Sequence, residues 1–286
     1  MKTRAEMVAS LTAVLLGVLA AGCEGSTTCG GIEAGACKPA DCAPPAARDG
    51  AQPAPDLSGA VSLALERRQQ KTASDCGPTA LWMVIGFLGG QETYADVMKH
   101  YTILPSIGVY DSHNAMAAMD LGYKATIISY NYRVIHPLWH ELSGDELMVK
   151  LQSYLPKLQE EKDKVSAAGY IELLKRKGEI KFPPLSRELI VSYLLKGLPV
   201  MIAVDVEYLY RGMTTVDPFR PDHWTHALVV HGYDPTTDEF EVADPWFQIP
   251  LPHKDGHYRV SSGRLLTAIL LAFQFNDGSV VVVEKS

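Results

Sequence analysis

The expected centre of the fold is the segment DCGPTALWMVIGFLGG, residues 75–90. The pattern predicts a helix, with Asp75 as a candidate N-cap and Pro78 inside the first turn. Gly89 and Gly90 follow the last apolar residue and are expected to end the helix. Because apolar residues occupy nearly its whole circumference, we expect this helix to be central and buried.

Cys76 lies at the start of this helix and is the only cysteine between residues 58 and 286. The N–H groups and the dipole of a helix N-terminus favour a thiolate, and they lower a thiol pKa below its free value of about 8.5. The alternative is a small buried hydrophobic residue, the commonest role of a free cysteine. The preceding Asp75 and the following Gly77 and Pro78 indicate a turn that presents the thiol. Cys76 is therefore a candidate nucleophile.

Residues 1–22 have the pattern of an export signal. Lys2 and Arg4 precede a nearly apolar run over residues 7–20, which is too short for a transmembrane helix and fits the core of a signal peptide. The sequence LAAGC at residues 19–23 then resembles the bacterial lipobox, in which the cysteine thiol takes a diacylglycerol group. The alternative is a plain secretory signal, and in both interpretations the protein leaves the cytoplasm.

The lipobox resemblance implies that Cys23 is lipidated and attaches the protein to a membrane. No Asp follows Cys23, which favours the periplasmic face of the outer membrane, or the cell surface. Residues 23–57 are rich in Gly, Ala and Pro and predict a flexible tether. Export permits disulfides, and one pair among Cys29, Cys37 and Cys42 is compatible with the sequence.

Residues 58–286 are expected to form one folded domain in which helices precede antiparallel strands. The expected helices cover 93–100, 112–121, 145–177 with breaks near Pro156 and Gly169, and 186–196. The expected strands cover 123–130, 200–206, 225–233, 239–243 and 280–284. This order predicts an α+β fold, with an N-terminal helical part packed on an antiparallel sheet.

The charge distribution argues against nucleic acid as a partner. The chain has 26 Lys and Arg residues against 33 Asp and Glu residues, which gives a net charge of -7. Nucleic-acid binding needs basic residues gathered on one face, whereas here they are scattered. The hydrophobic content of 47% is sufficient for a buried core.

Two features around the nucleophile carry a resemblance to a known family. Residues 74–81, SDCGPTAL, resemble the nucleophile segment of C39-like peptidases, which belong to the papain clan of cysteine peptidases. Gln70 lies six residues before Cys76, where the family has a glutamine that donates its amide to the oxyanion together with the backbone N–H of the cysteine. Such donors are typically worth a few kcal/mol in the transition state. Gln69 is a competitor for this role.

The second half of the resemblance lies near residue 230. Residues 225–234, THALVVHGYD, are similar to the family's strand that carries the catalytic histidine, which corresponds to His226. Residues 241–246, EVADPW, are similar to its Asp-Pro segment, so Asp244 is implied to orient the imidazole. The resemblance implies a papain-like fold and no cofactor.

A hairpin argument supports the pairing of His226 with Asp244. If residues 234–238 form the loop, Tyr233 faces Glu239 and Leu228 faces Asp244. His226 then lies diagonally from Asp244 on the same face, at about 7–8 Å between Cα atoms, within reach of a hydrogen bond. This argument is conditional on the register, because a shift of one residue reverses the face.

Other polar and aromatic residues are candidates for substrate binding. His223, Trp224 and Trp246 flank the candidate histidine and aspartate; they are expected to line or roof the site, and the alternatives are loop positions and core packing. Tyr208, Tyr210 and Phe219 are candidates to line a substrate groove. A metal site at His223 lacks a third ligand, so no metal is expected.

The predicted function is that of a cysteine peptidase acting on a peptide or protein outside the cytoplasm. Residues 133–184 form a helical insertion that is longer than the resemblance implies, and it could cap the site, bind a partner or only decorate the fold. The alternative function is a catalytically inactive, lipid-tethered peptide-binding module of the same fold.

Overall fold

In the computed structural model, the described residues are 59–103, 108–210, 225–246, 248, 255–275 and 279–286. The chain divides into two units, Met1–Ala51 and Gln52–Ser286, and every described residue lies in the second. The predicted signal peptide and tether, with Cys23, Cys29, Cys37 and Cys42, lie outside the described residues. None of the described helices is long and apolar enough to cross a membrane.

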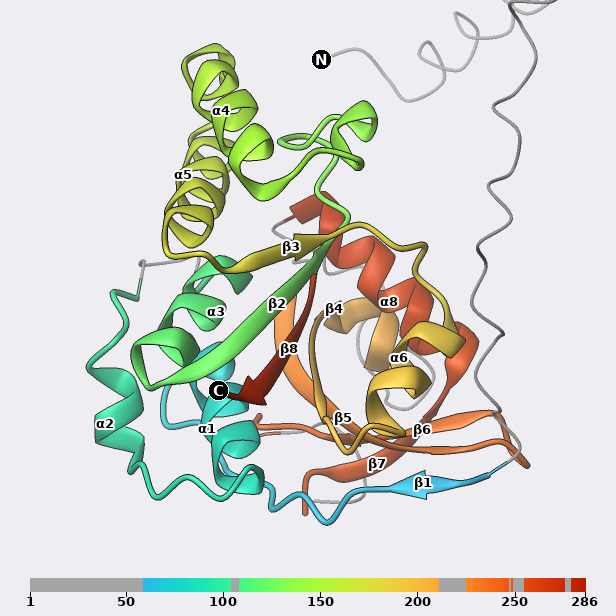
Figure 1. The fold of residues 1–286 in the computed structure, drawn as a ribbon. Coiled ribbons are helices and arrows are strands. Elements are labelled where there is room, and N and C mark those ends of the chain that lie inside the picture. Colours follow the sequence, from blue (N-terminus) through green and yellow to red (C-terminus); the bar gives the residue numbers. More distant parts are fainter. Residues whose placement is uncertain (1–58, 104–107, 211–224, 247, 249–254, 276–278) are drawn as a thin grey trace, which may run out of the picture. The chain divides into compact units, whose positions relative to one another are not determined.

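The described strands form one sheet in the order β3-β2-β8-β4-β5-β6-β7, with β1 paired to β5 (Figure 1). Every pairing is antiparallel except that of β2 with β3. The strands are β1 Val61–Ser62, β2 Tyr123–Ser129, β3 Glu179–Lys181, β4 Val200–Asp205, β5 Thr225–Asp234, β6 Glu239–Ala243, β7 His257–Ser261 and β8 Ser279–Lys285. The central strands β4 and β5 are almost fully buried, which explains their continuous apolar sequence.

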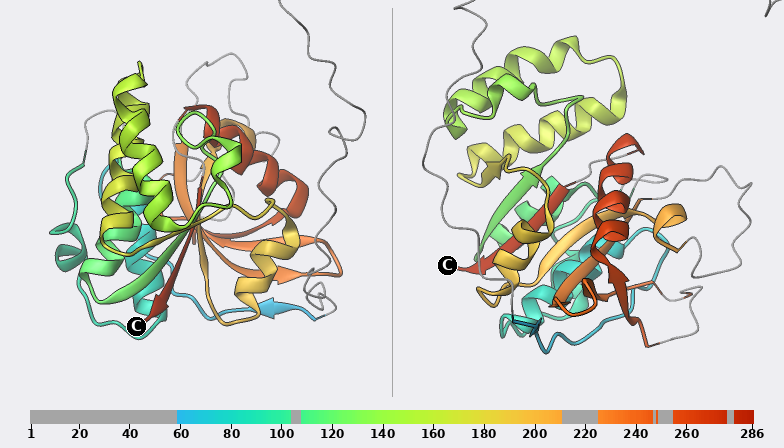
Figure 2. Two further views of the ribbon diagram at one scale, coloured as in Figure 1. Left: turned by 45° about the horizontal axis from the view of Figure 1, so that its top comes forward. Right: turned by 90° about the vertical axis from the view of Figure 1, so that its right-hand side faces the viewer.

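Helices cover both faces of this sheet (Figure 2). Ala227 and Val229 of β5 belong to a core shared with α1, α3, α4 and α5, whereas Leu228 and Val230 belong to a core shared with α6, α7 and α8. The helices are α1 Cys76–Phe87, α2 Tyr94–Met98, α3 Asp111–Asp120, α4 Gly144–Tyr154, α5 Glu161–Lys175, α6 Arg187–Leu194, α7 Val206–Tyr210 and α8 Ser262–Phe275, with short 3-10 turns η2 Pro137–Trp139 and η3 Leu155–Lys157. The predicted α+β class, with the Cys76 helix packed on an antiparallel sheet, is confirmed.

Helix α1 is central and buried, as predicted from its apolar circumference. Gly89, just beyond the helix, has a φ of 86°, a left-handed conformation that glycine adopts without strain. Asp75 occupies the predicted N-cap position of α1, but its side chain makes no capping hydrogen bond to this helix. Its buried carboxylate instead accepts hydrogen bonds from the backbone N–H groups of Lys71 and Thr72 and from the hydroxyl of Tyr94.

The insertion at residues 133–184 is helical, and α4 and α5 run side by side in it (Figure 2). The break near Pro156 is confirmed, because η3 separates the two helices there. The expected break at Gly169 is wrong, since this residue lies inside α5. A Cβ atom at Gly169 would lie 2.2 Å from Oγ of Ser112. The glycine thus permits close packing of α5 on α3 and does not end the helix.

The hairpin of β5 and β6 differs from the expected register by one residue at its turn. Asp234, not Tyr233, pairs with Glu239. An irregularity between Val230 and Gly232 then absorbs one residue, His231, and Val229 pairs with Ala243. If this second register is extended by one residue, Leu228 faces Asp244, as predicted from the sequence.

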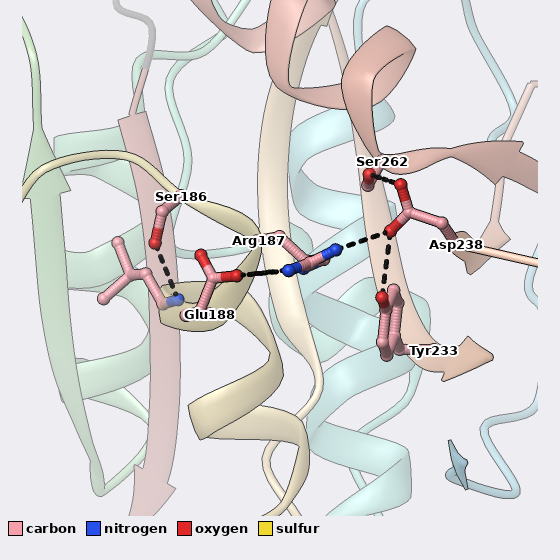
Figure 3. Close-up of polar contacts among 7 residues, drawn as sticks. Ser186, Arg187, Glu188, Tyr233, Asp238 and Ser262 are labelled. Atoms are coloured by element: carbon pink, nitrogen blue, oxygen red, sulfur yellow. Dashed lines mark hydrogen bonds and ion pairs between the residues drawn. The ribbon is translucent and has the colours of Figure 1, made fainter. Parts of the chain in front are cut away.

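Asp238 fixes the far end of this hairpin (Figure 3). It has a φ of 55°, and its carboxylate accepts hydrogen bonds from Tyr233 (2.9 Å), Arg187 (3.2 Å) and Ser262 (2.6 Å). The three donors come from β5, α6 and the start of α8, so one side chain ties three elements together.

We expect Asp238→Ala to lower the free energy of unfolding by about 1–2 kcal/mol, because three partly exposed donors lose their acceptor. Urea titration at pH 7 measures this loss. Asp238→Asn is the matched control, since asparagine tolerates the left-handed conformation and keeps one acceptor oxygen. A loss for Asp238→Ala no larger than that for Asp238→Asn would contradict the assigned role.

Candidate active site

The structure brings Cys76, at the first position of α1, next to His226, near the start of β5. Cys76 is half-buried, and the buried His226 imidazole lies close enough to the sulfur to lower the pKa of the thiol. The backbone N–H groups of Ala227 and Gly77 also lower the pKa of the thiol. A Cβ atom at Gly77 would lie 2.9 Å from Oδ1 of Asn114, so a glycine allows α3 to approach this end of α1.

These contacts favour a thiolate paired with an imidazolium. Burial alone raises the pKa of the Cys76 thiol, but His226 and the two backbone N–H groups lower it further than burial raises it. Burial alone lowers the pKa of His226, but Asp244 and the Cys76 sulfur raise it to about 10. Each group thus stabilises the charged form of the other at neutral pH.

Asp244 is completely buried and holds the far side of the imidazole. Its Oδ1 accepts hydrogen bonds from Nε2 of His226 (2.8 Å) and from the backbone N–H of Trp246 (2.8 Å). Nδ1 is then the ring nitrogen that remains for the Cys76 sulfur. Burial alone raises the pKa of Asp244, but His226, Tyr210 and the Trp246 N–H hold it below its ordinary value.

Gln70, six residues before Cys76 in the chain, contacts the segment that follows Asp244. It is buried, and its backbone N–H donates to the carbonyl of Pro245 at 2.9 Å. Its side-chain amide donates one hydrogen bond to the carbonyl of Thr72 at 2.7 Å, and the group has a second N–H. Gln69, the competing residue, is exposed.

Arg67 fastens the segment that contains Asp244. Its guanidinium donates to the backbone carbonyls of Asp244 (2.8 Å) and Trp246 (2.6 Å). A Cβ atom at Gly256 would lie 2.3 Å from Nε of Arg67, so this glycine makes room for the guanidinium. No sequence motif predicts this role of Arg67.

Among the residues expected to bind substrate, Trp246 lies beside the imidazole. Its ring is edge-on to that of His226, with centroids 6.0 Å apart. His223 and Trp224 lie outside the described residues. The expected groove position of Tyr210 is wrong, because its hydroxyl donates to Oδ2 of Asp244 at 2.6 Å.

Tyr258 donates a second phenol hydrogen bond to the same Asp244 oxygen, at 2.9 Å. Sequence reasoning missed it, because no motif marks a tyrosine in a strand that follows the Asp-Pro segment. The only signal available is the alternation along β7, which places Tyr258 opposite Val242, two residues before Asp244.

No group of three or more His, Cys, Asp or Glu side chains among the described residues is arranged to hold a metal ion. His231 forms a separate pair with His257, with Nε2 and Nδ1 3.2 Å apart. Its own Nδ1 lies 3.0 Å from the carbonyl of Leu63, and burial followed by the proximity of His257 lowers its pKa. His231 is therefore not the histidine that contacts Asp244.

The sequence model of the Peptidase_C39 like family matches residues 62–256, and the chain belongs to this family. The match spans both the Cys76 segment and the hairpin with His226 and Asp244. The family and the fold class predicted from the sequence are thereby confirmed. No curated protein matches the chain.

Several solved structures are similar to the chain. The peptidase domain of Streptococcus ComA, a bi-functional ABC transporter, is 13% identical, with a TM-score of 0.39 over 78% of this chain and 99% of that chain. A putative C39-like peptidase from Bacillus anthracis is 13% identical, with a TM-score of 0.45 over 80% and 98%. Xylellain, a cysteine protease from Xylella fastidiosa, is 14% identical, with a TM-score of 0.35 over 79% and 86%.

Proposed function

We propose that this protein is a cysteine peptidase that hydrolyses peptide bonds by acyl transfer through Cys76. The observation that carries the proposal is the order of three side chains, in which His226 lowers the pKa of the Cys76 thiol and is hydrogen-bonded to Asp244 at 2.8 Å. A thiol, a base within hydrogen-bonding distance and a group that orients the base are the requirements of nucleophilic catalysis. Membership of the Peptidase_C39 like family supports the same chemistry.

In the proposed reaction, the Cys76 thiolate attacks the carbonyl carbon of the scissile bond. The second N–H of Gln70 and the backbone N–H of Cys76 stabilise the resulting oxyanion. The His226 imidazolium gives its proton to the leaving amine as the C–N bond breaks, and a thioester remains on Cys76. His226 then takes a proton from water, the hydroxide displaces the sulfur, and the carboxylic acid is released. Asp244 keeps the imidazole aligned throughout.

We propose a peptide or protein as the substrate and no nucleic acid as a partner. The proposed location is outside the cytoplasm, with the protein tethered to a membrane by a lipid on Cys23, at the periplasmic face of the outer membrane or at the cell surface. The support is the signal-like residues 1–22, the lipobox-like residues 19–23 and the net charge of -7.

The second candidate function is a lipid-tethered module that binds peptides without cutting them. It needs a surface for a peptide, but it does not need a thiol with a lowered pKa. The reactivity of Cys76 therefore separates the two functions.

We expect iodoacetamide to alkylate Cys76 at pH values well below the free thiol pKa of about 8.5, because His226 and the backbone N–H groups lower the Cys76 pKa. The experiment uses the full chain under reducing conditions, with alkylation at each cysteine followed by peptide mass spectrometry between pH 4 and 10. Cys29, Cys37 and Cys42 in the same digest are the internal controls. A Cys76 profile that coincides with theirs would favour the binding module.

Peptide cleavage is measured in parallel, with a mixed peptide library at pH 7 and identification of the products by mass spectrometry. Cleavage together with early alkylation supports the peptidase. Early alkylation without cleavage of any library peptide would count against hydrolysis.

A further inference from the structure

We propose that Tyr210 and Tyr258 are positioning residues that hold the Asp244 carboxylate in the one orientation useful for acyl transfer. This inference rests on the proposed peptidase function, because the group they position is the one that aligns His226. Both phenol hydroxyls donate to Oδ2 of Asp244, at 2.6 Å and 2.9 Å. The other oxygen, Oδ1, is thereby kept for His226 and the Trp246 N–H.

The chain brings Tyr210 to this position through a short helix at the end of β4. Asp205 is the last residue of β4 and pairs with Thr225, the neighbour of His226. Its carboxylate accepts a hydrogen bond from the backbone N–H of Tyr208 at 2.8 Å and so caps the first turn of α7. Tyr210 ends α7 and is buried, with its hydroxyl on Asp244.

Tyr258 reaches the same oxygen from a strand of the sheet, and it belongs with Tyr210 to the core shared with α8. In β7 it pairs with Val242 of β6, and Asp244 lies two residues beyond Val242 on the same face. The backbone N–H of Asp244 also donates to the carbonyl of Gly256, which continues the ladder past the end of β6. The two tyrosines therefore come from different elements that converge on one carboxylate.

The chemistry of the pair suits a positioning role. Burial and the neighbouring carboxylate raise the pKa of both phenols well above the ordinary value, so the hydroxyls stay protonated and act as donors. Asp244 has no exposed surface, so water cannot replace a lost donor. With two donors on each oxygen, rotation of the carboxylate breaks several charge-assisted hydrogen bonds at once.

The other charged and titratable groups around Asp244 remain when a phenol is removed. They are the other tyrosine, His226 from β5, Arg67, whose guanidinium binds the Asp244 carbonyl, and Cys76 beyond the imidazole. Removal of a hydroxyl that binds the ionised carboxylate raises the pKa of Asp244, because the anion loses a donor and the neutral acid loses less. The carboxylate also gains freedom to turn away from Nε2.

The test compares Tyr210→Phe, Tyr258→Phe and the double variant with the parent protein. Each single substitution is expected to lower kcat about 10-fold with KM unchanged, since the lost interaction acts through His226 and not on substrate. Carbon-13 NMR of the aspartate carboxyls is expected to show a higher Asp244 pKa in both single variants. Separate single variants keep the test decisive if one of them fails to fold.

Tyr233→Phe is the matched control. Tyr233 is also a buried tyrosine that donates to an aspartate, Asp238 at 2.9 Å, but it lies at the end of β5 next to the hairpin turn. It is expected to leave kcat and the Asp244 pKa unchanged. Unchanged kcat and unchanged Asp244 pKa in both Tyr210→Phe and Tyr258→Phe, with an active parent, would overturn the inference.

Failure of the proposed function is recognised separately. If the parent cleaves no peptide, the rate of Cys76 alkylation at pH 7 replaces kcat in the same comparison. A slower rate in both Tyr210→Phe and Tyr258→Phe, and not in Tyr233→Phe, indicates that the two tyrosines support the reactivity of the Cys76 thiolate through Asp244 and His226. Equal rates in all five proteins would remove that role as well.

Discussion

Cys76→Ala is expected to abolish peptide hydrolysis, with a fall in kcat/KM of about 10⁴-fold or more. Among the described residues of the site, the Cys76 sulfur is the atom that would form the covalent acyl intermediate, and alanine leaves the His226 base with no nucleophile to activate. The fold should be retained, because Cys76 is half-buried and only its sulfur is lost. We expect a stability change of about 1 kcal/mol, measured by urea unfolding.

His226→Ala tests whether Cys76 acts as part of a unit. If the two residues act together, the double variant Cys76→Ala/His226→Ala loses about as much activity as either single variant. The effects of substitutions within one catalytic unit are strongly non-additive. Additive losses would mean that Cys76 and His226 serve different steps.

Labelling of the domain by iodoacetamide should also disappear in Cys76→Ala. Labelling of residues 58–286 that persists in that variant would contradict the assignment of the nucleophile.

Asp244→Asn is expected to lower kcat about 10³–10⁴-fold, because an amide at this position can present an N–H to Nε2 of His226 and select the wrong tautomer. Stability is also expected to fall, by about 2–3 kcal/mol, since four donors now face a group with one acceptor oxygen. Both values are measured on the same protein at pH 7, by peptide turnover and by urea unfolding.

The pH dependence of folding stability has opposite signs for Asp244 and His226. The pKa of Asp244 is lowered by folding, so its charge stabilises the folded state above its unfolded pKa of about 3.9 and this is lost as pH falls through the folded value. The pKa of His226 is raised to about 10, so its contribution is complete below about 6.5 and is lost as pH rises toward 10. An Asp244→Asn protein with the parent's acid dependence of stability would contradict this account.

Much of the fold could be predicted from local pattern. The apolar circumference of residues 76–87 marks a helix buried between sheet and helices, and the runs 123–129 and 200–205 have the composition of buried strands. Helix α8 was not predicted from the sequence. The strand β7 directly before it ends at Ser261, so no loop separates the two elements.

Part of the candidate site was predicted for reasons that are only half correct. The contact of His226 with Asp244 follows from hairpin parity, and the hydrogen bond of 2.8 Å confirms that contact. The assumed pairing of Tyr233 with Glu239 is wrong, and the extra residue at His231 compensates for the error. Parity alone cannot detect such a residue, because it depends on how the backbone bends within the sheet.

Other contacts of the site could not be predicted, because they depend on convergence in space. Tyr210 and Tyr258 lie 48 residues apart in sequence, on a helix and a strand, and they meet only at Asp244. Asp75 has the sequence position of a helix cap, but the loop before it folds back to supply other donors. Such arrangements are decided by tertiary packing and not by residue type or spacing.

The extra residue in β5 has a consequence for how related chains are compared. Val229 faces the α1 core, whereas Tyr233, also an odd-numbered residue, faces the α8 core on the other side of His231. The alternation of side chains between the two faces of the sheet therefore changes phase at His231, so the residues on each side of His231 follow separate registers. An insertion or deletion between His231 and the turn leaves His226 on its present face of the sheet. A single inserted or deleted residue between His226 and Val230 moves the His226 side chain to the opposite face. In an alignment, the distance from the histidine to this change of phase carries more information than the distance to the aspartate.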